Sequence, residues 1–311
     1  MAWKSSKLNS DTGAELQLYG QMPRRKPKAI VQINHGMAEH AARYERFAGV
    51  LAKAGYGAYA HDHRGHGVTT APDAALGVFA HKNGLNTVLQ DVAAVNQHIK
   101  DNHPDVPIVC FGHSMGSIIG FNYILRKSDT VAAAALWNSG VETGAPGLIF
   151  SSILRIQRMF KGSDVPSGLA TKATFETWNK EFAPNRTDFD WLSRDETEVD
   201  KYVDDPLCGF PVSIGLWLDV LEGIYFAADN KNLSKLPKDF PVHLLAGDQD
   251  PCSERGKAVA NIARRMQSAG MTKVSLNVLT DARHESLNEV NRDATMAMFI
   301  DWLDSWFAAK S

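Results

Sequence analysis

The chain has 311 residues, of which 44% are hydrophobic and 22% are charged, and its formal net charge is −2. This balance is that of an ordinary globular protein, and a chain of this length forms one large domain or a core with an inserted subdomain. The near-neutral charge lacks the basic footprint that nucleic-acid binding requires, so we expect no nucleic-acid partner.

We also expect neither a secretion signal nor a membrane span. Residues 1–20 lack the apolar core of a signal peptide, and no run reaches the roughly 18 to 20 apolar residues of a membrane-spanning helix. The three cysteines, Cys110, Cys208 and Cys252, are far apart and odd in number. This usage predicts a reducing compartment without structural disulfides, and therefore a cytoplasmic protein.

In chain order, an alternating strand-like segment near the N-terminus is followed by short apolar runs that alternate with amphipathic segments of helix length. Buried strands are predicted at 28–36, 56–62, 106–114, 131–140, 240–250 and 273–284. Helices are predicted at 43–55, ended by Gly55, at 86–102, capped by Asn86, and at 115–127, 254–269 and 292–308. Such alternation predicts an α/β fold with a mostly parallel sheet and helices on both of its faces.

The alternation stops between residue 141 and about residue 210. This segment is rich in Trp, Arg and Pro, and it contains no clear buried strand. We expect residues 1–140 and 211–311 to form the α/β core, and residues 141–210 to form an inserted cap.

The sequence "CFGHSMGS" places Gly112-x-Ser114-x-Gly116 between a predicted strand and a predicted helix. Glycines allow the sharp turn that lifts the Ser114 hydroxyl above the sheet edge, and the following helix directs its free N–H groups at the same point. Within strand–turn–helix this pattern is typical of a nucleophile elbow. The alternative is a serine packed in a tight turn.

A nucleophilic serine needs a base and an acid that orients the base. After a nucleophile elbow both are expected later in the chain, on loops that follow strands. "LLAGDQDPCS" offers Asp248 and Asp250, and we choose Asp250 because Asp248 lies nearer the strand end and more readily shapes the turn. "LTDARHESLNE" offers His284, since the other late histidine, His243, lies inside a predicted strand.

Acyl transfer also needs donors for a developing oxyanion. The backbone N–H of Met115 directly follows the serine. The second donor is expected in the loop "INHGMAEHAARY", where Gly36 leaves the backbone accessible, and the N–H of Met37 is the candidate.

The stretch "YAHDHRGHGVTT" groups three histidines and one aspartate within residues 61–66 and therefore invites a zinc interpretation. A dinuclear site of the metallo-β-lactamase type has the pattern H-x-H-x-D-H, and here Gly65 replaces the required aspartate. Without that carboxylate the residues lack a ligand that a dinuclear zinc site needs. We expect instead that Asp62 and Arg64 brace the loop and that His66 packs against it, with no metal bound.

Six motifs together resemble the monoacylglycerol lipase and lysophospholipase branch of the α/β-hydrolases, which belongs to the serine aminopeptidase S33 type. They are "HGMAEHAARY" (35–44), "DHRGHGVT" (62–69), "GHSMGS" (112–117), "DPLCGF" (205–210), "GDQDPCS" (247–253) and "RHESLNE" (283–289). The resemblance implies an α/β-hydrolase fold with a helical cap and no cofactor. It also implies a catalytic triad of Ser114, Asp250 and His284, an oxyanion hole at Met37 and Met115, and a histidine block that shapes the surroundings of the site.

Substrate-pocket candidates come from these motifs and from the cap. They are His35, Gly36, His113, Asn138, Ile149, Ile153 and Trp178. His113 is expected to pack rather than react, and Trp191 is a further cap aromatic that either lines the pocket or belongs to the core. "LWNSGVETG" (136–144) departs from the plainer Ser-Pro or Ser-Ala-Pro run expected of relatives, so Asn138 and Glu142 are expected to make the pocket more polar.

The segment 146–162 repeats Ile149, Ile153, Ile156 and Phe160 at helical spacing, with basic residues elsewhere on its surface. The helix either packs its apolar face on the core, or it acts as a lid whose apolar face guides an acyl chain or touches a lipid surface.

These patterns predict a serine hydrolase of monoacylglycerol- or lysophospholipid-like esters, acting through an acyl-enzyme on a small ester or lipid substrate. Alternatives on the same scaffold are a small-ester esterase, a thioesterase or a capped aminopeptidase, for which Glu142, Glu176 and Glu181 offer acidic groups. A slow-turnover ligand receptor is the remaining alternative.

Overall fold

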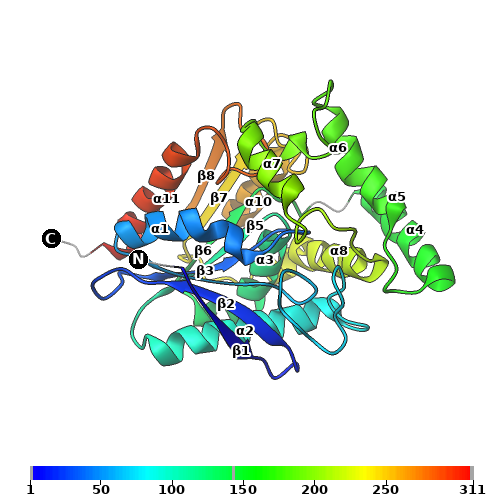
Figure 1. Cartoon of the computed structure of the whole chain (residues 1–311). Coiled ribbons are helices and arrows are strands. Elements are labelled where there is room, and N and C mark those ends of the chain that lie inside the picture. The colour runs from blue at the N-terminus through cyan, green and yellow to red at the C-terminus, as the bar shows by residue number, and fades with distance from the viewer. Residues whose placement is uncertain (1–2, 142–143, 309–311) are drawn as a thin grey trace.

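The computed structural model describes residues 3–141 and 144–308, and a single eight-stranded sheet lies at its centre (Figure 1). The spatial order of the strands is β1-β2-β4-β3-β5-β6-β7-β8. β1 and β2 pair antiparallel with each other, β2 pairs antiparallel with β4, and every pair from β4 to β8 is parallel. The strands are β1 (Lys4–Asn9), β2 (Glu15–Gln21), β3 (Ile30–Asn34), β4 (Gly57–His61), β5 (Ile108–His113), β6 (Ala133–Trp137), β7 (Val242–Gly247) and β8 (Val274–Leu279).

The strands in the middle of the sheet are buried along their whole length. Every residue of β3, β5, β6 and β7 is buried, which is why these segments appear in the sequence as mostly apolar runs without a polar–apolar alternation. Their register aligns Asn34 with Gly112, and His113 with Trp137. The residues that follow β5, β6 and β7 therefore emerge at one edge of the sheet.

Helices cover both faces of the sheet. α1 (Glu45–Lys53) and α11 (Arg292–Phe307) bury their apolar residues in one core cluster. A second, larger cluster holds the apolar faces of α2 (Gly84–Asn102), α3 (Met115–Lys127), α8 (Ile214–Ala228) and α10 (Lys257–Ser268). The mostly parallel α/β sheet with helices on both faces is thus confirmed.

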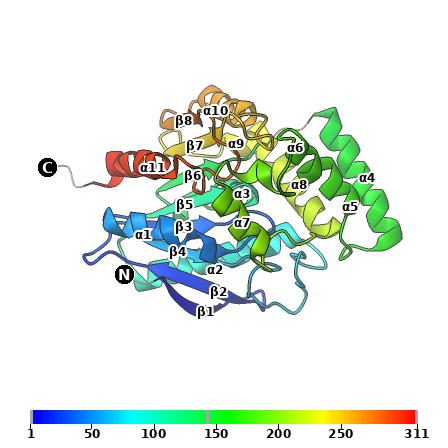
Figure 2. The same ribbon diagram turned by 45° about the horizontal axis from the view of Figure 1, so that its top comes forward.

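Between β6 and β7 the chain leaves the sheet and forms a helical cap. Its helices are α4 (Ala145–Lys161), α5 (Gly168–Thr171), α6 (Thr177–Lys180) and α7 (Glu196–Asp204), and the short α9 (Asn230–Leu233) follows α8. Both views place α4, α5 and α6 at the end of the molecule opposite the two termini (Figures 1 and 2). The predicted boundaries of the cap at 141 and 210 stay a prediction.

Several predicted helix boundaries are wrong. The second helix begins at Gly84 rather than Asn86, after Asn83 in a left-handed conformation (φ 55°). α10 begins at Lys257 rather than 254, because residues 254–256 all have positive φ and cannot continue a right-handed helix. α1 is preceded by a 3₁₀ turn over Ala41–Tyr44, and helix α8 was not predicted.

Of the two alternatives for α4, the one in which its apolar stripe packs on the core does not match the structure. Only Ser151 and Leu154 of this helix are buried. Ile156 is 57% exposed and Phe160 is 80% exposed. The apolar face of α4 is therefore left without a partner among the described residues.

Among the described residues, no helix combines the length and apolarity needed to cross a membrane. The three cysteines are free thiols. The cytoplasmic location expected from their number and spacing stays a prediction.

Candidate active site

The turn between β5 and α3 places Ser114 in a strained backbone conformation with φ 55°. The two flanking glycines are required by close packing. A Cβ atom on Gly112 would lie 2.2 Å from the carbonyl oxygen of Gly116, and one on Gly116 would lie 2.1 Å from that of Asn34. The Ser114 N–H donates to the carbonyl of Trp137 at 2.9 Å, which fixes the turn against β6. This local geometry is that of a nucleophile elbow.

A chain of hydrogen bonds joins Ser114, His284 and Asp250. His284 Nε2 lies 2.9 Å from Ser114 Oγ, and His284 Nδ1 lies 2.9 Å from Asp250 Oδ1. Asp250 follows β7 and His284 follows β8, so three segments distant in sequence meet at one sheet edge. With its proton on Nδ1, His284 donates to Asp250 and accepts from the serine hydroxyl, the arrangement in which an imidazole can take a proton from an alcohol.

Asp250 is fully buried, yet it is well supplied with donors. The Cys252 N–H donates to its Oδ1 at 3.0 Å and the Asn138 amide donates to its Oδ2 at 3.4 Å. Burial alone would raise the pKa of this carboxyl, but the charge of His284 and the hydrogen bonds to the carboxylate hold the pKa below its ordinary value. Asp248 takes no part in the chain; its N–H donates to the carbonyl of Leu279, as a turn residue does.

Two backbone donors near Ser114 are unused. The N–H groups of Met37 and Met115 form no hydrogen bond within the described residues, and Met115 is the first residue of α3, where an N–H has no acceptor inside the helix. The N–H of Gly36, by contrast, donates to Glu39 Oε1 at 2.5 Å. Of the neighbouring N–H groups at 36 and 37, the one at Met37 is thus available to a ligand.

The pocket over Ser114 is small. Its cavity volume is only about 30 Å³, and Met37, Trp191 and His284 are among its lining residues. A larger groove of about 400 Å³ lies next to it in the cap, and Phe175 and Phe189 line both. The Trp191 ring lies 4.7 Å from the His284 ring, so cap aromatics form the roof of the site.

The predicted pocket residues separate into two groups. Gly36 and His113 line the pocket. The pKa of His113 falls to about 4, first because the ring is buried and then because His284 is near, so this ring is neutral around pH 7. The others do not line it: His35 lies beneath the loop, Asn138 lies behind Asp250, Trp178 packs on Phe175 and Trp191, and Ile149 and Ile153 face outward on α4. The predicted contribution of Glu142 lies outside the described residues.

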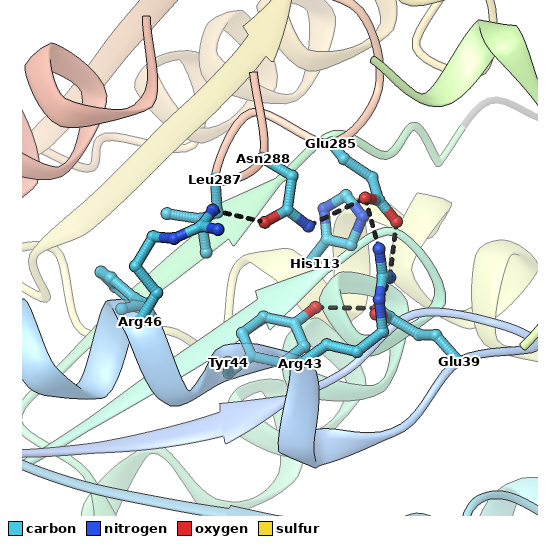
Figure 3. A pocket seen from close by; sticks show the side chains of 9 residues that line it. Glu39, Arg43, Tyr44, Arg46, His113, Glu285, Leu287 and Asn288 are labelled. Carbon is cyan, nitrogen blue, oxygen red and sulfur yellow. Dashed lines mark hydrogen bonds and ion pairs between the residues drawn. The ribbon is translucent and has the colours of Figure 1, made fainter. Parts of the chain in front are cut away.

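The structure adds a charged cluster that sequence reasoning missed. Arg43 forms ion pairs with Glu39 and Glu285 (Figure 3). Both carboxylates also line the Ser114 pocket. All three residues lie inside the motifs "HGMAEHAARY" and "RHESLNE". Oppositely charged residues four positions apart, at 39 and 43, were the available signal, but charge pairs are so common on helical turns that the spacing did not stand out.

The histidines of the block at residues 61–66 pack ring on ring with His35. The ring centroids of His35 and His63 are 4.4 Å apart, and those of His61 and His63 are 4.6 Å apart. In the part of the chain that the structure describes, possible ligand atoms converge within 4.8 Å in two other places, His40–Asp205–Cys208 and Asp250–Cys252–His284. In both groups the histidine is already hydrogen-bonded to the aspartate.

The residues between these histidines brace the loop, as expected. Asp62 accepts the N–H groups of Ala41 and Val68, and the buried Arg64 donates to Asp91 at 2.7 Å. His66 packs against Phe79 and Phe210.

Comparison with known proteins agrees with this geometry. A mouse monoglyceride lipase is 28% identical over 86% of this chain and 83% of its own length. An abhydrolase domain-containing protein of Dictyostelium discoideum is 25% identical over 96% of this chain, which spans 28% of that protein. The structure of a thermostable carboxyl esterase from Bacillus coagulans in complex with glycerol superimposes with a TM-score of 0.90 at 24% identity, covering 99% of this chain and all of that one.

A model of the family described as serine aminopeptidase, S33, matches residues 25–291. This range contains all six motifs, so the resemblance drawn from them is confirmed. The chain belongs to the serine aminopeptidase S33 family of α/β-hydrolases.

Proposed function

We propose that the protein is a serine hydrolase that cleaves carboxylic esters of the monoacylglycerol or lysophospholipid type through an acyl-enzyme. The observation that carries this proposal is the hydrogen-bond chain from Ser114 through His284 to Asp250, beside two unused backbone N–H groups. The similarity to a monoglyceride lipase over most of the chain supports the substrate class.

In the first half of the reaction, Ser114 Oγ attacks the ester carbonyl carbon while its proton passes to His284 Nε2. The Met37 and Met115 N–H groups hold the oxyanion, and the Asp250 carboxylate stabilises the imidazolium. The tetrahedral intermediate collapses, the ester C–O bond breaks, and the imidazolium protonates the leaving alcohol. Ser114 is then acylated.

In the second half, water attacks the acyl-enzyme and gives its proton to His284. Collapse of the second intermediate breaks the bond to Ser114 Oγ, which takes the proton back, and the carboxylic acid leaves. One ester and one water thus become one acid and one alcohol, without a cofactor.

The test is the initial rate of hydrolysis of p-nitrophenyl esters from two to sixteen carbons by the wild type and by Ser114→Ala. We expect a maximum at medium or long chains and loss of turnover in the variant. Turnover by Ser114→Ala equal to that of the wild type would contradict the mechanism.

The size of the pocket favours a second candidate, a small-ester esterase. Room for only about 30 Å³ next to Ser114 admits an acetyl group more readily than a long acyl chain, unless Phe175 and Phe189 move and join the pocket to the groove in the cap. A rate maximum at acetate or butyrate would identify this second candidate. If no ester is hydrolysed, thioesters and aminoacyl amides are the substrates to test next.

We further propose that residues 141–210 act as the cap and that α4 contacts a lipid surface. Its exposed apolar side chains include Ile156 and Phe160, and Arg155, Arg158 and Lys161 lie on the same helix and are exposed. An apolar face with flanking cations fits the boundary of a bilayer that contains anionic lipid.

Sedimentation with vesicles tests the lipid contact. We expect the wild type to bind phosphatidylcholine vesicles more tightly when they contain phosphatidylserine, and Ile156→Ser/Phe160→Ser to lose binding. A wild type that binds neither kind of vesicle would refute the contact without touching the hydrolase proposal.

A further inference from the structure

The loop that carries the Met37 donor and the loop that carries His284 are joined by one guanidinium group (Figure 3). Arg43 Nη1 lies 2.6 Å from Glu39 Oε2 and 2.6 Å from Glu285 Oε1, and Nη2 lies 2.7 Å from Glu285 Oε2. Arg43 and Glu285 are 242 positions apart in the chain. We propose that Arg43 is a positioning residue that sets the oxyanion donor and the imidazole in register over Ser114; this rests on the proposed function.

At one end of the bridge, Glu39 shapes the backbone of the oxyanion loop. Its Oε1 accepts the Gly36 N–H at 2.5 Å and the Tyr44 hydroxyl at 2.8 Å. Gly36 has no space for a side chain, since a Cβ atom there would lie 2.8 Å from this same oxygen. The carboxylate thus occupies the Gly36 N–H and leaves that of Met37 for a ligand.

The same loop contains a strained residue that needs outside support. Ala38 has φ 53°, a conformation that an alanine adopts only when its surroundings enforce it. Its carbonyl accepts the Tyr202 hydroxyl and the Gly209 N–H, both at 2.9 Å. The loop is held by the cap on one side and by Glu39 on the other, so displacing Glu39 allows it to relax.

At the other end of the bridge, Glu285 directly follows His284. Its N–H donates to the carbonyl of Leu192 at 2.7 Å, and its Oε2 also accepts the Asn288 amide at 2.9 Å. The guanidinium holds this carboxylate with two parallel bonds, which fixes an orientation as well as a distance. The position of the backbone that carries His284 is therefore fixed relative to the loop that carries the Met37 N–H.

Only an arginine fits between the two carboxylates. Its planar fork reaches both at once, and its face lies 4.9 Å from the Tyr202 ring. Burial would raise the pKa of Glu39, but Arg43, and then His113 and the hydrogen bonds, keep it below its ordinary value, so the carboxylate stays charged. A lysine at this position would pair with one carboxylate and leave the other misplaced.

Steady-state kinetics on the ester that the wild type prefers test the proposal, with Arg43→Lys, Arg43→Ala and the control Arg46→Lys. Arg46 lies three positions further along, in α1, and does not line the pocket over Ser114; it pairs with Glu198 in the cap rather than with either carboxylate of the bridge. We expect Arg43→Lys to lower kcat by about 10- to 100-fold with KM changed less than threefold, because a displacement of about 1 Å of a reacting group has effects of this size. Arg46→Lys should match the wild type.

Two further readouts separate positioning from simple loss of structure. The second-order rate of Ser114 labelling by a fluorophosphonate should fall in Arg43→Lys by the same factor as kcat, while the near-UV circular dichroism stays that of the wild type. Ethylguanidine, but not ethylamine, should restore kcat to Arg43→Ala. If Arg43→Ala does not fold, the Arg43→Lys results decide alone.

The outcomes distinguish this inference from the proposed function. A wild type that neither hydrolyses esters nor reacts with the fluorophosphonate would overturn both. An active wild type with kcat of Arg43→Lys within threefold of it, or with a change confined to KM, would overturn the positioning role alone.

Discussion

The cap consists of two segments that differ in how deeply their contacts with the core are buried. The inner segment, residues 190–210, is held by ion pairs and hydrogen bonds to buried partners; Arg194, for example, lies 2.9 Å from the fully buried Glu289. The outer segment, residues 145–181, exposes most of α4. It meets the core through the packing of α4 on α8, through backbone hydrogen bonds of residues 163–167 to residues 212–215, and through exposed ion pairs. The two segments touch in an aromatic cluster around Trp191 and Phe175.

This difference indicates which part of the cap supports the proposed active site. The inner segment contacts the loops that carry Met37 and His284: Tyr202 and Gly209 donate to the carbonyl of Ala38, and Leu192 accepts the N–H of Glu285. The outer segment supplies Phe175 to the pocket wall, but within the described residues it forms no backbone hydrogen bond with those loops. Changes in the inner segment should therefore alter stability and catalysis, whereas changes on the outer surface should alter substrate access and surface binding.

Acid pH should act most strongly, because Phe210 of the inner segment packs on the buried His66, whereas the histidine that pairs with the outer segment, His81 with Asp164, is exposed. Burial lowers the pKa of His61 and His66 to about 4. Between pH 6.5 and 4 the unfolded chain takes up these protons and the folded protein does not, so stability falls as pH falls. We expect a loss of up to about 1.4 kcal/mol per pH unit for each ring.

Urea unfolding at pH values from 7 to 5 measures this loss. His66→Phe keeps a ring against Phe210 and should flatten the pH dependence, while His81→Gln, at an exposed position, should leave it unchanged. An identical slope in His66→Phe would show that the buried ring is not the titrating group.

The next largest effect is expected at Glu289, the anchor of the inner segment. Its buried carboxylate accepts the N–H groups of Arg194, Arg283 and Val290 and the Arg194 guanidinium. Glu289→Ala removes the buried acceptor that these donors share and should lower the free energy of unfolding by about 3 to 5 kcal/mol. Glu196→Ala on α7, with a side chain that is 78% exposed, is the matched control and should stay within about 0.5 kcal/mol. Equal effects of the two substitutions would contradict the anchored state of the inner segment.

The core and the cap also differ in how far the sequence predicts them. The sequence predicts Ser114 from its strand–turn–helix context, and Asp250 and His284 from their places on loops after later strands, because parallel strands bring the residues that follow them to one edge. The sheet itself was predictable because β3, β5, β6 and β7 are short, mostly apolar runs.

The cap was not predictable in the same way. The spacing of apolar residues in α4 is that of a helix that packs on a core, and the sequence does not indicate that its apolar side faces outward. The Glu39–Arg43–Glu285 bridge depends on a contact across 242 positions, which local spacing does not encode. Likewise, the wall formed by Phe175 and Phe189 arises from the tertiary packing of the cap.

Two residues on α4 measure the boundary between buried and exposed within the outer segment. Leu154 is fully buried and Ile156 is 57% exposed. Leu154→Ala should lower the free energy of unfolding by about 3 kcal/mol, since it removes buried methyl groups and leaves a cavity. Ile156→Ala should stay within about 0.5 kcal/mol. Thermal unfolding of both variants checks this, and a large loss in Ile156→Ala would mean that the apolar face of α4 is covered in solution, by a second copy or another part of the chain.

The smallest effect is expected at the exposed ion pair of Glu181 with Arg255. The Arg255 Nη2 to Glu181 Oε2 distance is 2.8 Å, close to the 2.9 Å of the Arg194–Glu289 pair, but here both side chains are more than a third exposed. Water solvates exposed ions nearly as well as the ions stabilise each other. A double-mutant cycle of Glu181→Gln and Arg255→Gln should therefore give a coupling free energy below about 1 kcal/mol, and 1 M salt should remove it. A coupling above about 2 kcal/mol that survives salt would mean that the outer segment is fastened to the core as firmly as the inner one. In that case the groove behind Phe175 would open only at the expense of the fold, and the small pocket over Ser114 would favour short esters.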